Sequence, residues 1–312
     1  MKSMTHLITR SRMCGFNMVE LMVAMAIGLV LSGAGITVYV NTRTTIDVNQ
    51  AVSRLQENAR YAIDELTRDL RLSGYWGRNN AAEYVDNRTG QSGALSDPTG
   101  DCAAGWYNDL DKRVQGLDDT NAPWTTCIPN ASYSQGDILA MRFVDPTPIT
   151  ALMANTVYLR SGRNWGRLFT GTVQPTTPGQ NYRVGNRAYY VRPFTNTAGD
   201  GIPALIRVVQ TDTGGGASLQ PEVVISGVEN LQVQYAVDTD GNGSVDRYLN
   251  GDGGVTWSQV EALRLWVLVR ADTVERGYTN NTAYQLAEGA WTPNANDNFR
   301  RVLLTKTIRL RN

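Results

Sequence analysis

Acidic and small residues between Asp238 and Asp246 place an oxygen-bearing side chain at every second position. The five positions are Asp238, Asp240, Asn242, Ser244 and Asp246. Gly243 stands at the sixth position of the run, where a calcium loop of the EF-hand type makes its sharp turn. Because Ca²⁺ is a hard cation that binds several oxygen ligands in a tight turn, this spacing predicts a Ca²⁺ site.

The match to an EF-hand loop is incomplete after Asp246. The twelfth position is Leu249 instead of a bidentate glutamate, and no EF-hand helix precedes the loop. The missing ligand would have to come from Asp252, a distant acid or water. The same residues also suit a hairpin turn after a strand at 231–237, because Asp, Asn and Gly adopt positive φ in such turns. The residues alone leave both interpretations open.

The cysteines point to an exported protein. Cys14 lies in the N-terminal residues 1–15, a leader that we expect to be removed for the reasons given below. This leaves Cys102 and Cys127 as an even pair. In an oxidising compartment these two would form a disulfide across a loop of about 26 residues, worth roughly 3 kcal/mol. The alternative is two free thiols in a loop.

Histidine usage excludes several kinds of catalysis. The single histidine, His6, lies in the leader, so the mature chain would have no Ser-His-Asp triad, no Cys-His pair and no His-ligated zinc. Two acid pairs could in principle serve a glycosidase: Asp109 with Asp111, and Asp118 with Asp119. Acids in a Gly- and Asn-rich loop are far more often solvated surface. With no nucleophile elbow, P-loop or dinucleotide fingerprint, we predict that the protein is not an enzyme.

The charge balance excludes a nucleic-acid partner. The 312-residue chain carries 29 basic and 29 acidic side chains. Lys2, Arg10 and Arg12 all lie in the leader, and removing them leaves 26 basic against 29 acidic side chains. The sequence therefore predicts no basic surface for nucleic acid.

The chain begins with a basic leader and an apolar run that is long enough to cross a bilayer as a helix. From Met18 to Val40 the only charged residue is Glu20. A charge in such a segment costs on the order of 2.5–3.5 kcal/mol, so Glu20 needs a partner. If the chain were cut after Gly15, the new amine of Phe16 could pair with Glu20 of a neighbouring copy and set the register between subunits.

The helical pattern continues beyond the apolar run. Residues 16–40 are the predicted membrane half of a long helix, and residues 41–74 its amphipathic half. Apolar side chains recur every three or four residues, at Val48, Val52, Leu55, Ala59, Ala62, Leu66 and Leu70. Gly74 is expected to end the helix as its C-terminal cap.

The rest of the chain predicts a sheet preceded by an insertion. Residues 75–136 are rich in Gly, Asn, Asp and Pro and hold three tryptophans, so they read as an irregular insertion with the cysteine pair or as a surface loop. Residues 137–312 read as strands and turns. The expected strands are 138–144, 157–160, 187–192, 204–210, 222–226, 231–237, 260–270 and 301–311. Alternation in 231–237 predicts Gln232 and Gln234 facing water. The fold class is α+β, a long helix on an antiparallel sheet.

The run Gly15-Phe16-Asn17-Met18-Val19-Glu20 resembles the class III signal of type IV pilins and type II secretion pseudopilins. The resemblance implies that a prepilin peptidase removes residues 1–15 and methylates Phe16. An ordinary signal peptide cut near residues 32–35, or a plain signal anchor, explains neither the Gly-Phe junction nor Glu20. The family plan is pilin-like, a long helix packed on a sheet domain.

Several segments are similar to the PilW subgroup of minor pilins, namely 55–60, 69–75, 227–235 and 310–312. The resemblance implies a structural subunit that initiates pilus assembly in a tip complex with PilV-, PilX- and FimU-like pilins and a tip adhesin. It implies an inner-membrane helix with the domain in the periplasm, then a place in the pilus at the cell surface. The alternatives are a GspJ-like minor pseudopilin and a membrane-anchored calcium-dependent adhesin.

Overall fold

The computed structural model describes residues 15, 17–79, 81–86, 95, 98–103, 105–212, 216–251, 253–294 and 297–311. The leader up to Cys14 lies outside this range, as do Phe16, Asp252 and Asn312. The chain divides into two compact units, Met1–Gln50 and Ala51–Asn312, which are described separately.

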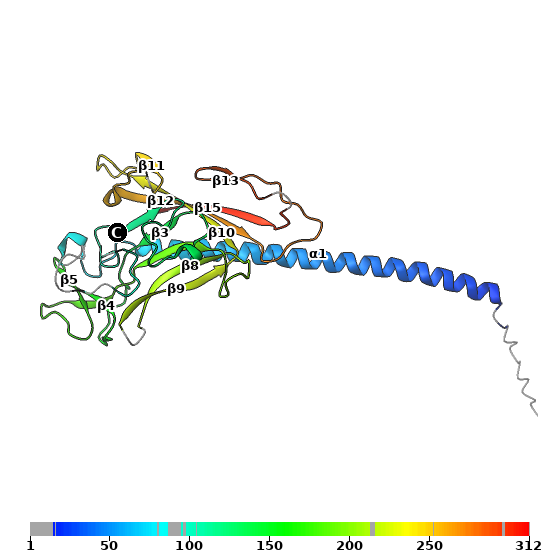
Figure 1. Cartoon of the computed structure of the whole chain (residues 1–312), viewed down its shortest axis with the longest axis horizontal. Helices are drawn as coiled ribbons and strands as arrows, with labels where there is room; N and C mark the ends of the chain where they lie inside the picture. Colours follow the sequence, from blue (N-terminus) through cyan, green and yellow to red (C-terminus); the bar gives the residue numbers. More distant parts are fainter. Residues whose placement is uncertain are drawn as a thin grey trace, which may run out of the picture. The chain divides into compact units, whose positions relative to one another are not determined.

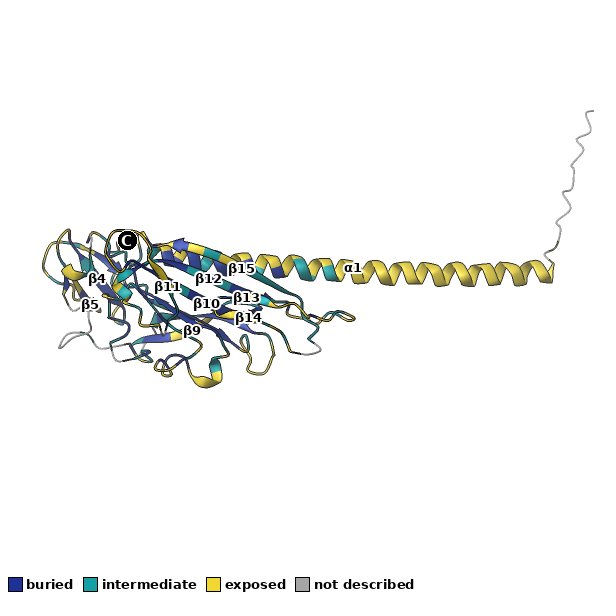
Figure 2. Cartoon of the chain, turned by 90° about the horizontal axis from the view of Figure 1, so that it is seen from above, coloured by how far each residue is buried: buried dark blue, intermediate teal, exposed yellow. Residues whose placement is uncertain are grey.

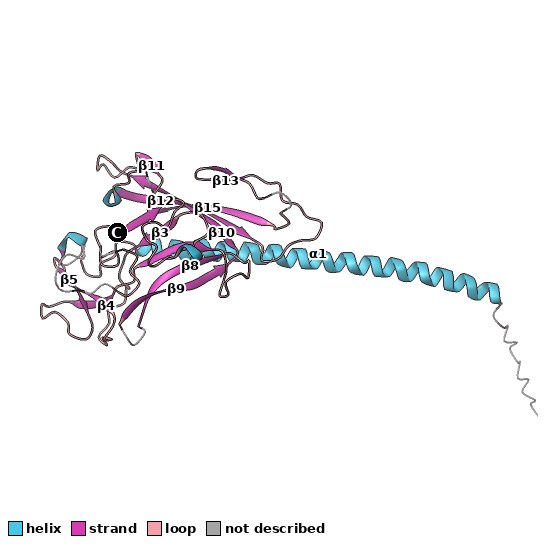
Figure 3. Ribbon diagram, viewed as in Figure 1, coloured by secondary structure: helices cyan, strands magenta, loops and turns pink. Residues whose placement is uncertain are grey.

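Helix α1 (Met18–Leu72) forms as predicted, and its glycines at 28, 33 and 35 do not interrupt it (Figure 3). In the first unit, each described residue from 17 to 47 is exposed (Figure 2). In the second unit, the helix ends where Tyr75 N–H donates to the Leu72 carbonyl at 2.9 Å. Gly74 adopts a φ of +82°, which is the left-handed cap conformation expected of it.

In its described residues the second unit contains a five-stranded sheet, two four-stranded sheets and a hairpin (Figure 1). One of the four-stranded sheets has shorter strands and is called the smaller sheet below, and the other two are the larger sheets. The sheet that ends the chain has the order β11 (Arg247–Leu249), β10 (Val228–Val237), β12 (Val260–Arg270), β15 (Arg301–Arg309). The five-stranded sheet has the order β2 (Val114–Leu117), β3 (Ile138–Met141), β7 (Arg187–Arg192), β8 (Ala204–Asp212), β9 (Ala217–Ser226). The named strand pairs in both sheets are antiparallel, which confirms the α+β class.

The remaining strands lie outside these two sheets. A smaller sheet has the order β1 (Val85–Asp86), β5 (Gly166–Thr170), β4 (Val157–Ser161), β6 (Gln180–Arg183), and β1 pairs with β5 in parallel. The hairpin joins β13 (Tyr284–Leu286) to β14 (Gly289–Trp291). Short 3₁₀ turns occur at η1 (Ala82–Tyr84), η2 (Asn130–Ser132) and η3 (Trp257–Gln259).

The apolar stripe of α1 is buried in the main core. Its five C-terminal members are Leu55, Ala59, Ala62, Leu66 and Leu70, and each is buried. They share one cluster with inward side chains of both larger sheets, including Leu139 of β3, Val191 of β7 and Leu263 of β12. Helix and sheets therefore stabilise each other through a continuous apolar interface.

A second core lies between the smaller sheet and the five-stranded sheet. It contains side chains from residues 76–128 together with Leu159 of β4 and Ile206 of β8. Strand β2, which comes from the expected insertion, pairs with β3 as the outer strand of the five-stranded sheet. The segment 75–136 is therefore built into the sheet and its core.

The expectation for Gln232 is wrong. Its side chain is only 5% exposed, and Glu288 N–H donates to its Oε1 at 3.4 Å. The turn of the β13–β14 hairpin thus covers this part of the outer face of β10, which local alternation alone does not reveal. Strands β5 and β6 were not predicted, because Gly166 and the polar residues Gln180 and Asn181 weaken the strand pattern there.

Candidate functional site

The first candidate site is the N-terminal end of α1. Glu20 lies in its first turn, three residues after Asn17, whose carbonyl accepts from Leu21 N–H at 3.1 Å. Among the described residues, α1 is the helix long and apolar enough to cross a membrane, with a mean hydropathy of 2.2 in its most apolar window. The described side chains around Glu20, such as Met22 (69% exposed), are exposed. Phe16, the predicted new N-terminus, lies outside the described residues.

Charged groups hold the other end of α1 in the second unit. Asp69 is 1% exposed, and its Oδ2 accepts hydrogen bonds from the Arg187 guanidinium and the Tyr189 hydroxyl, both on β7. Arg207 Nη1 of β8 lies 3.9 Å from the same oxygen and 3.5 Å from Glu65 Oε2. Burial raises the pKa of Tyr189 well above its usual range, so its hydroxyl remains a donor.

The predicted calcium loop connects β10 to β11. One carboxylate oxygen from each of Asp238, Asp240 and Asp246 lies within 4.8 Å of the others. The Asp238 carboxylate accepts backbone N–H bonds from Gly241 at 2.7 Å and Gly243 at 2.6 Å. These bonds, that of Gly243 first, hold the pKa of Asp238 below its usual value, so the carboxylate is ionised at neutral pH.

The remaining two predicted ligands are also placed in the loop. Asn242 Nδ2 donates to Asp240 Oδ2 at 2.9 Å, and Asn242 Oδ1 accepts from Ser244 N–H at 2.7 Å. Thr239 N–H donates to Asp246 Oδ2 at 2.7 Å and closes the loop. The loop thus brings three carboxylates close together. Its internal hydrogen bonds also suit a hairpin turn, so both interpretations remain.

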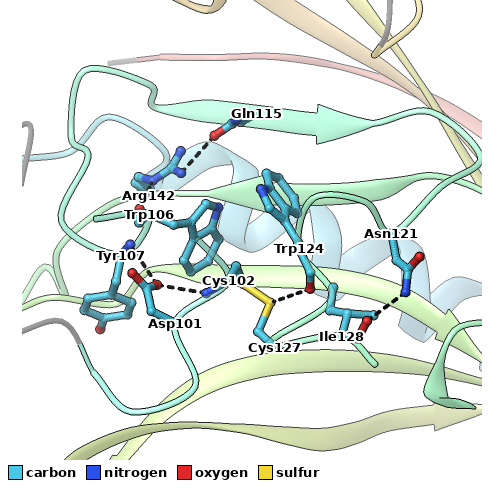
Figure 4. Close-up of a disulfide and its surroundings, with 10 residues drawn as sticks. All are labelled: Asp101, Cys102, Trp106, Tyr107, Gln115, Asn121, Trp124, Cys127, Ile128 and Arg142. Carbon is cyan, nitrogen blue, oxygen red and sulfur yellow. Dashed lines mark hydrogen bonds between the residues drawn. A yellow bond between two sulfur atoms is a disulfide. The ribbon is translucent and has the colours of Figure 1, made fainter. Parts of the chain in front are cut away.

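Cys102 and Cys127 are joined by a disulfide inside the second core (Figure 4). Trp106 and Trp124 lie beside it, with ring centroids 5.8 Å apart in an edge-to-face arrangement. Asp101 Oδ1 accepts from Cys102 N–H at 3.0 Å and thereby fixes the backbone at the bridge. The bridge closes a buried aromatic cluster rather than a surface loop.

Arg142 is a buried cation that the sequence analysis did not single out. Its side chain donates to the Trp106 carbonyl at 3.0 Å and to Gln115 Oε1 at 3.0 Å (Figure 4). It also donates to the Lys112 carbonyl at 2.7 Å. Its guanidinium carbon also lies 5.0 Å from the Trp106 ring centre. Burial lowers the pKa of Arg142 to about 10. The sequence feature that could have indicated this buried arginine is its position directly after the apolar residues 138–141.

Asp137 is a second buried titratable group that sequence reasoning missed. Its carboxylate accepts from Asp119 N–H at 3.2 Å and from Val233 N–H at 2.6 Å. Asp137 therefore links the segment that follows β2 to the middle of β10. Burial is the first cause that raises the pKa of Asp137 to about 8, with the nearby Asp118 adding to it.

The acids considered for catalysis do not converge into one site. Asp109 pairs with Lys112 at 2.8 Å, whereas Asp118 lies near Asp137 and Asp119 N–H is bonded to Asp137. A polar cleft of about 290 Å³ lies elsewhere, lined by Tyr107, Asp145 and Arg183 among others. In its floor the Tyr107 hydroxyl lies 2.9 Å from the Val184 carbonyl and 2.8 Å from Gln210 Oε1. These floor groups are satisfied within the fold.

Comparisons with known proteins bear on the whole arrangement. Residues 188–312 match the family model described as Type IV Pilus-assembly protein W, a range that runs from β7 to the end of the chain. The chain is also similar to Pilin-like protein PilA3 of Thermus thermophilus, with 37% identity over 68 residues. The matched stretch covers 21% of this chain and 29% of that relative, less than a third of its length. With a long N-terminal helix whose C-terminal half packs on antiparallel sheets, and with this C-terminal match, the chain is similar to type IV minor pilins.

Proposed function

We propose that the protein is a minor pilin of a type IV pilus, a structural subunit that helps to initiate assembly in a complex with other minor pilins. The observation that carries the proposal is the apolar helix with Glu20 in its first turn, in a chain whose C-terminal sheets match the pilus-assembly family. The buried stripe and the Asp69 contacts give the second unit a firm hold on the helix. A structural role, rather than catalysis, fits acids that are bonded within the fold.

Processing after Gly15 is part of the proposal. A prepilin peptidase would release Phe16 as a methylated N-terminus, and its amine would neutralise Glu20 of a neighbouring subunit. The pairing offsets the cost of a carboxylate in an apolar environment and makes contact with other pilins specific in register. Before assembly the helix would lie in the inner membrane with the second unit in the periplasm, and afterwards in the pilus.

The test is intact mass and N-terminal sequencing of the protein from cells with an active prepilin peptidase. A chain that starts at methylated Phe16 supports the pilin pathway, and cells without the peptidase provide the control. A start near Ile36 would indicate ordinary secretion, and an intact Met1 a simple membrane anchor. Either result would contradict the proposal.

A tip role is separated from secretion by deleting the coding sequence. Loss of pili, with secretion of folded exoproteins unchanged, supports the minor pilin. Loss of secretion with normal pili would favour the GspJ-like pseudopilin. Normal pili and normal secretion with lost adhesion would favour the anchored adhesin.

We propose that the Asp238–Asp246 loop binds Ca²⁺, because three carboxylates converge there and Asp238 is held ionised by backbone N–H groups. The same chain with Asp240→Asn should lose Ca²⁺-dependent heat in calorimetry, whereas Asp86→Asn, an exposed acid on β1, should keep it. Equal heats for both variants and the unaltered chain, or none for any of them, would contradict a calcium loop.

A further inference from the structure

Strand β15 is the outer strand of its sheet (red in Figure 1). Among the described residues, β12 is the one strand that pairs with it, over nine residue pairs from Ala262↔Arg309 to Arg270↔Arg301. The opposite edge of β15 therefore has no strand neighbour in the described part of the chain.

The backbone direction along this edge follows from two hydrogen bonds at its ends. Leu310 N–H donates to the Glu261 carbonyl at 2.9 Å, and Ala271 N–H donates to the Arg300 carbonyl at 2.8 Å. In an antiparallel ladder every second residue directs both backbone groups at its neighbour. Even-numbered residues of β15 therefore face β12, and the odd-numbered ones, Leu303, Thr305 and Thr307 among them, turn N–H and C=O outward.

This edge lacks two of the usual protections against pairing, proline and a β-bulge, and carries only charged side chains of one sign. The nine residues of β15 contain no proline, and their pairing with β12 has no register shift. Strand β9, the other long outer strand, contains Pro221 and pairs through a register shift at Leu205/Ile206. Outer strands β2 and β11 have four and three residues. A long, regular edge is a template for another strand.

The charge beside the edge selects the kind of strand. A hollow of about 420 Å³ runs along the C-terminal half of β15, and it is lined by Arg71, Lys306, Arg309 and Arg311 with three uncharged residues. No carboxylate is among the described residues that line it. Asp64 approaches Lys306 Nζ at 3.3 Å from the helix, so cations still outnumber carboxylates among the described residues at the hollow.

We propose that the outer edge of β15 is a docking site for an extended acidic segment of a partner subunit, which adds a strand to the sheet. Backbone groups of β15 would pair with the segment, and the cations of the hollow would bind its carboxylates. A second copy of β15 is a poor occupant, because it would place cations opposite cations. The inference rests on the proposed function only in naming the partner as another pilus subunit.

The experiment compares two variants of the full chain in detergent. Thr305→Pro removes an outward N–H and leaves the bonds to β12 in place, since proline is tolerated on the open side of an outer strand. Thr305→Ala keeps that N–H and is the matched control. The probe is a fluorescent peptide of alternating valine and glutamate, and its binding is followed by anisotropy. We expect Thr305→Pro to bind the peptide about tenfold more weakly than Thr305→Ala, because the backbone hydrogen bond at residue 305 is lost and the adjacent hydrogen bonds to the peptide are weakened.

Two further measurements make the outcome decisive. A peptide of alternating valine and lysine should bind far more weakly than the glutamate peptide. Hydrogen exchange of the backbone amides of the segment 301–311 should slow when the glutamate peptide is added, and should not slow with the lysine peptide. Equal binding of both peptides would overturn the proposal, and so would equal binding of the glutamate peptide to both variants. A dimer of the chain that Thr305→Pro abolishes would also overturn it, because a second copy would then occupy the edge. Thermal melting checks that both variants are folded. Peptide binding that persists in a chain never processed at Gly15 would leave this inference standing while the proposed function fails.

Discussion

The carboxylate of Asp69 and the guanidinium of Arg187 form an ion pair that joins the last turns of α1 to the first residue of β7. Asp69 is 1% exposed and Arg187 is 21% exposed, so water competes little for the carboxylate. Tyr189 shares the same oxygen. Because apolar side chains alone let a helix slide or rotate, this directional contact fixes the register of the helix on the sheet.

Asp69→Asn should destabilise the second unit. The change leaves Arg187 and Arg207 partly buried beside a neutral amide, and losing one partner of a buried pair costs about 3 kcal/mol. Asp64→Asn is the matched control, since Asp64 lies earlier on the same helix and its side chain is 73% exposed, where an ion pair contributes less than about 1 kcal/mol. Urea unfolding followed by fluorescence measures both, and equal losses would contradict a special role for Asp69.

Asp137 should make stability decrease as pH rises. Burial raises its pKa from 3.8 to about 8, so the folded chain holds this proton more tightly than the unfolded chain. The stabilising contribution is complete below pH 3.8 and is lost as the pH rises to about 8, at no more than about 1.4 kcal/mol per pH unit. Urea unfolding at several pH values between these limits gives the free energy of unfolding as a function of pH. This free energy should fall less steeply with pH in Asp137→Asn, because the amide cannot ionise. Asp86→Asn should keep the original slope, and an unchanged slope in Asp137→Asn would refute the assignment.

The disulfide should stabilise the second core. Replacing both Cys102 and Cys127 by serine should lower the free energy of unfolding by about 3 kcal/mol, because the unfolded chain gains the freedom of the opened loop. Reductant should produce the same loss in the unaltered chain and none in the double variant. Fluorescence of the neighbouring Trp106 and Trp124 reports the transition. Insensitivity of the unaltered chain to reductant would show that the bridge contributes nothing.

Glu20→Ala should be processed normally and yet fail to enter filaments. The peptidase junction at Gly15 is intact, whereas the charge that pairs with a neighbouring N-terminus is gone. Immunoblots of sheared pili and of membranes measure incorporation and processing. Val23→Ala, a small change in the same apolar run, should assemble, and Gly15→Asp should block cleavage. Filament entry by Glu20→Ala at the unaltered level would remove Glu20 from assembly.

Features encoded in neighbouring residues could be predicted from the sequence. The helix follows from the spacing of Leu55 to Leu70 and from Gly74, and the carboxylates of Asp238, Asp240 and Asp246 lie close together because one short loop holds all three. Contacts between distant segments could not be predicted. Asp69 meets Arg187 across 118 residues and Asp137 meets Val233 across 96, and only the folded sheets bring them together. Gln232 is buried for the same reason, since the hairpin that covers it lies far along the chain.

The helix is the first part of the second unit to be synthesised, whereas Ile308 and Leu310, which share its core cluster, are among the last. Lys306 reaches Asp64 across 242 residues. The apolar stripe of α1 therefore gains its full cover only when residues far along the chain are in place, and folding waits for these long-range contacts to form. A chain that stops before β15 leaves this stripe without its last cover. Truncation there would therefore expose apolar surface that favours aggregation.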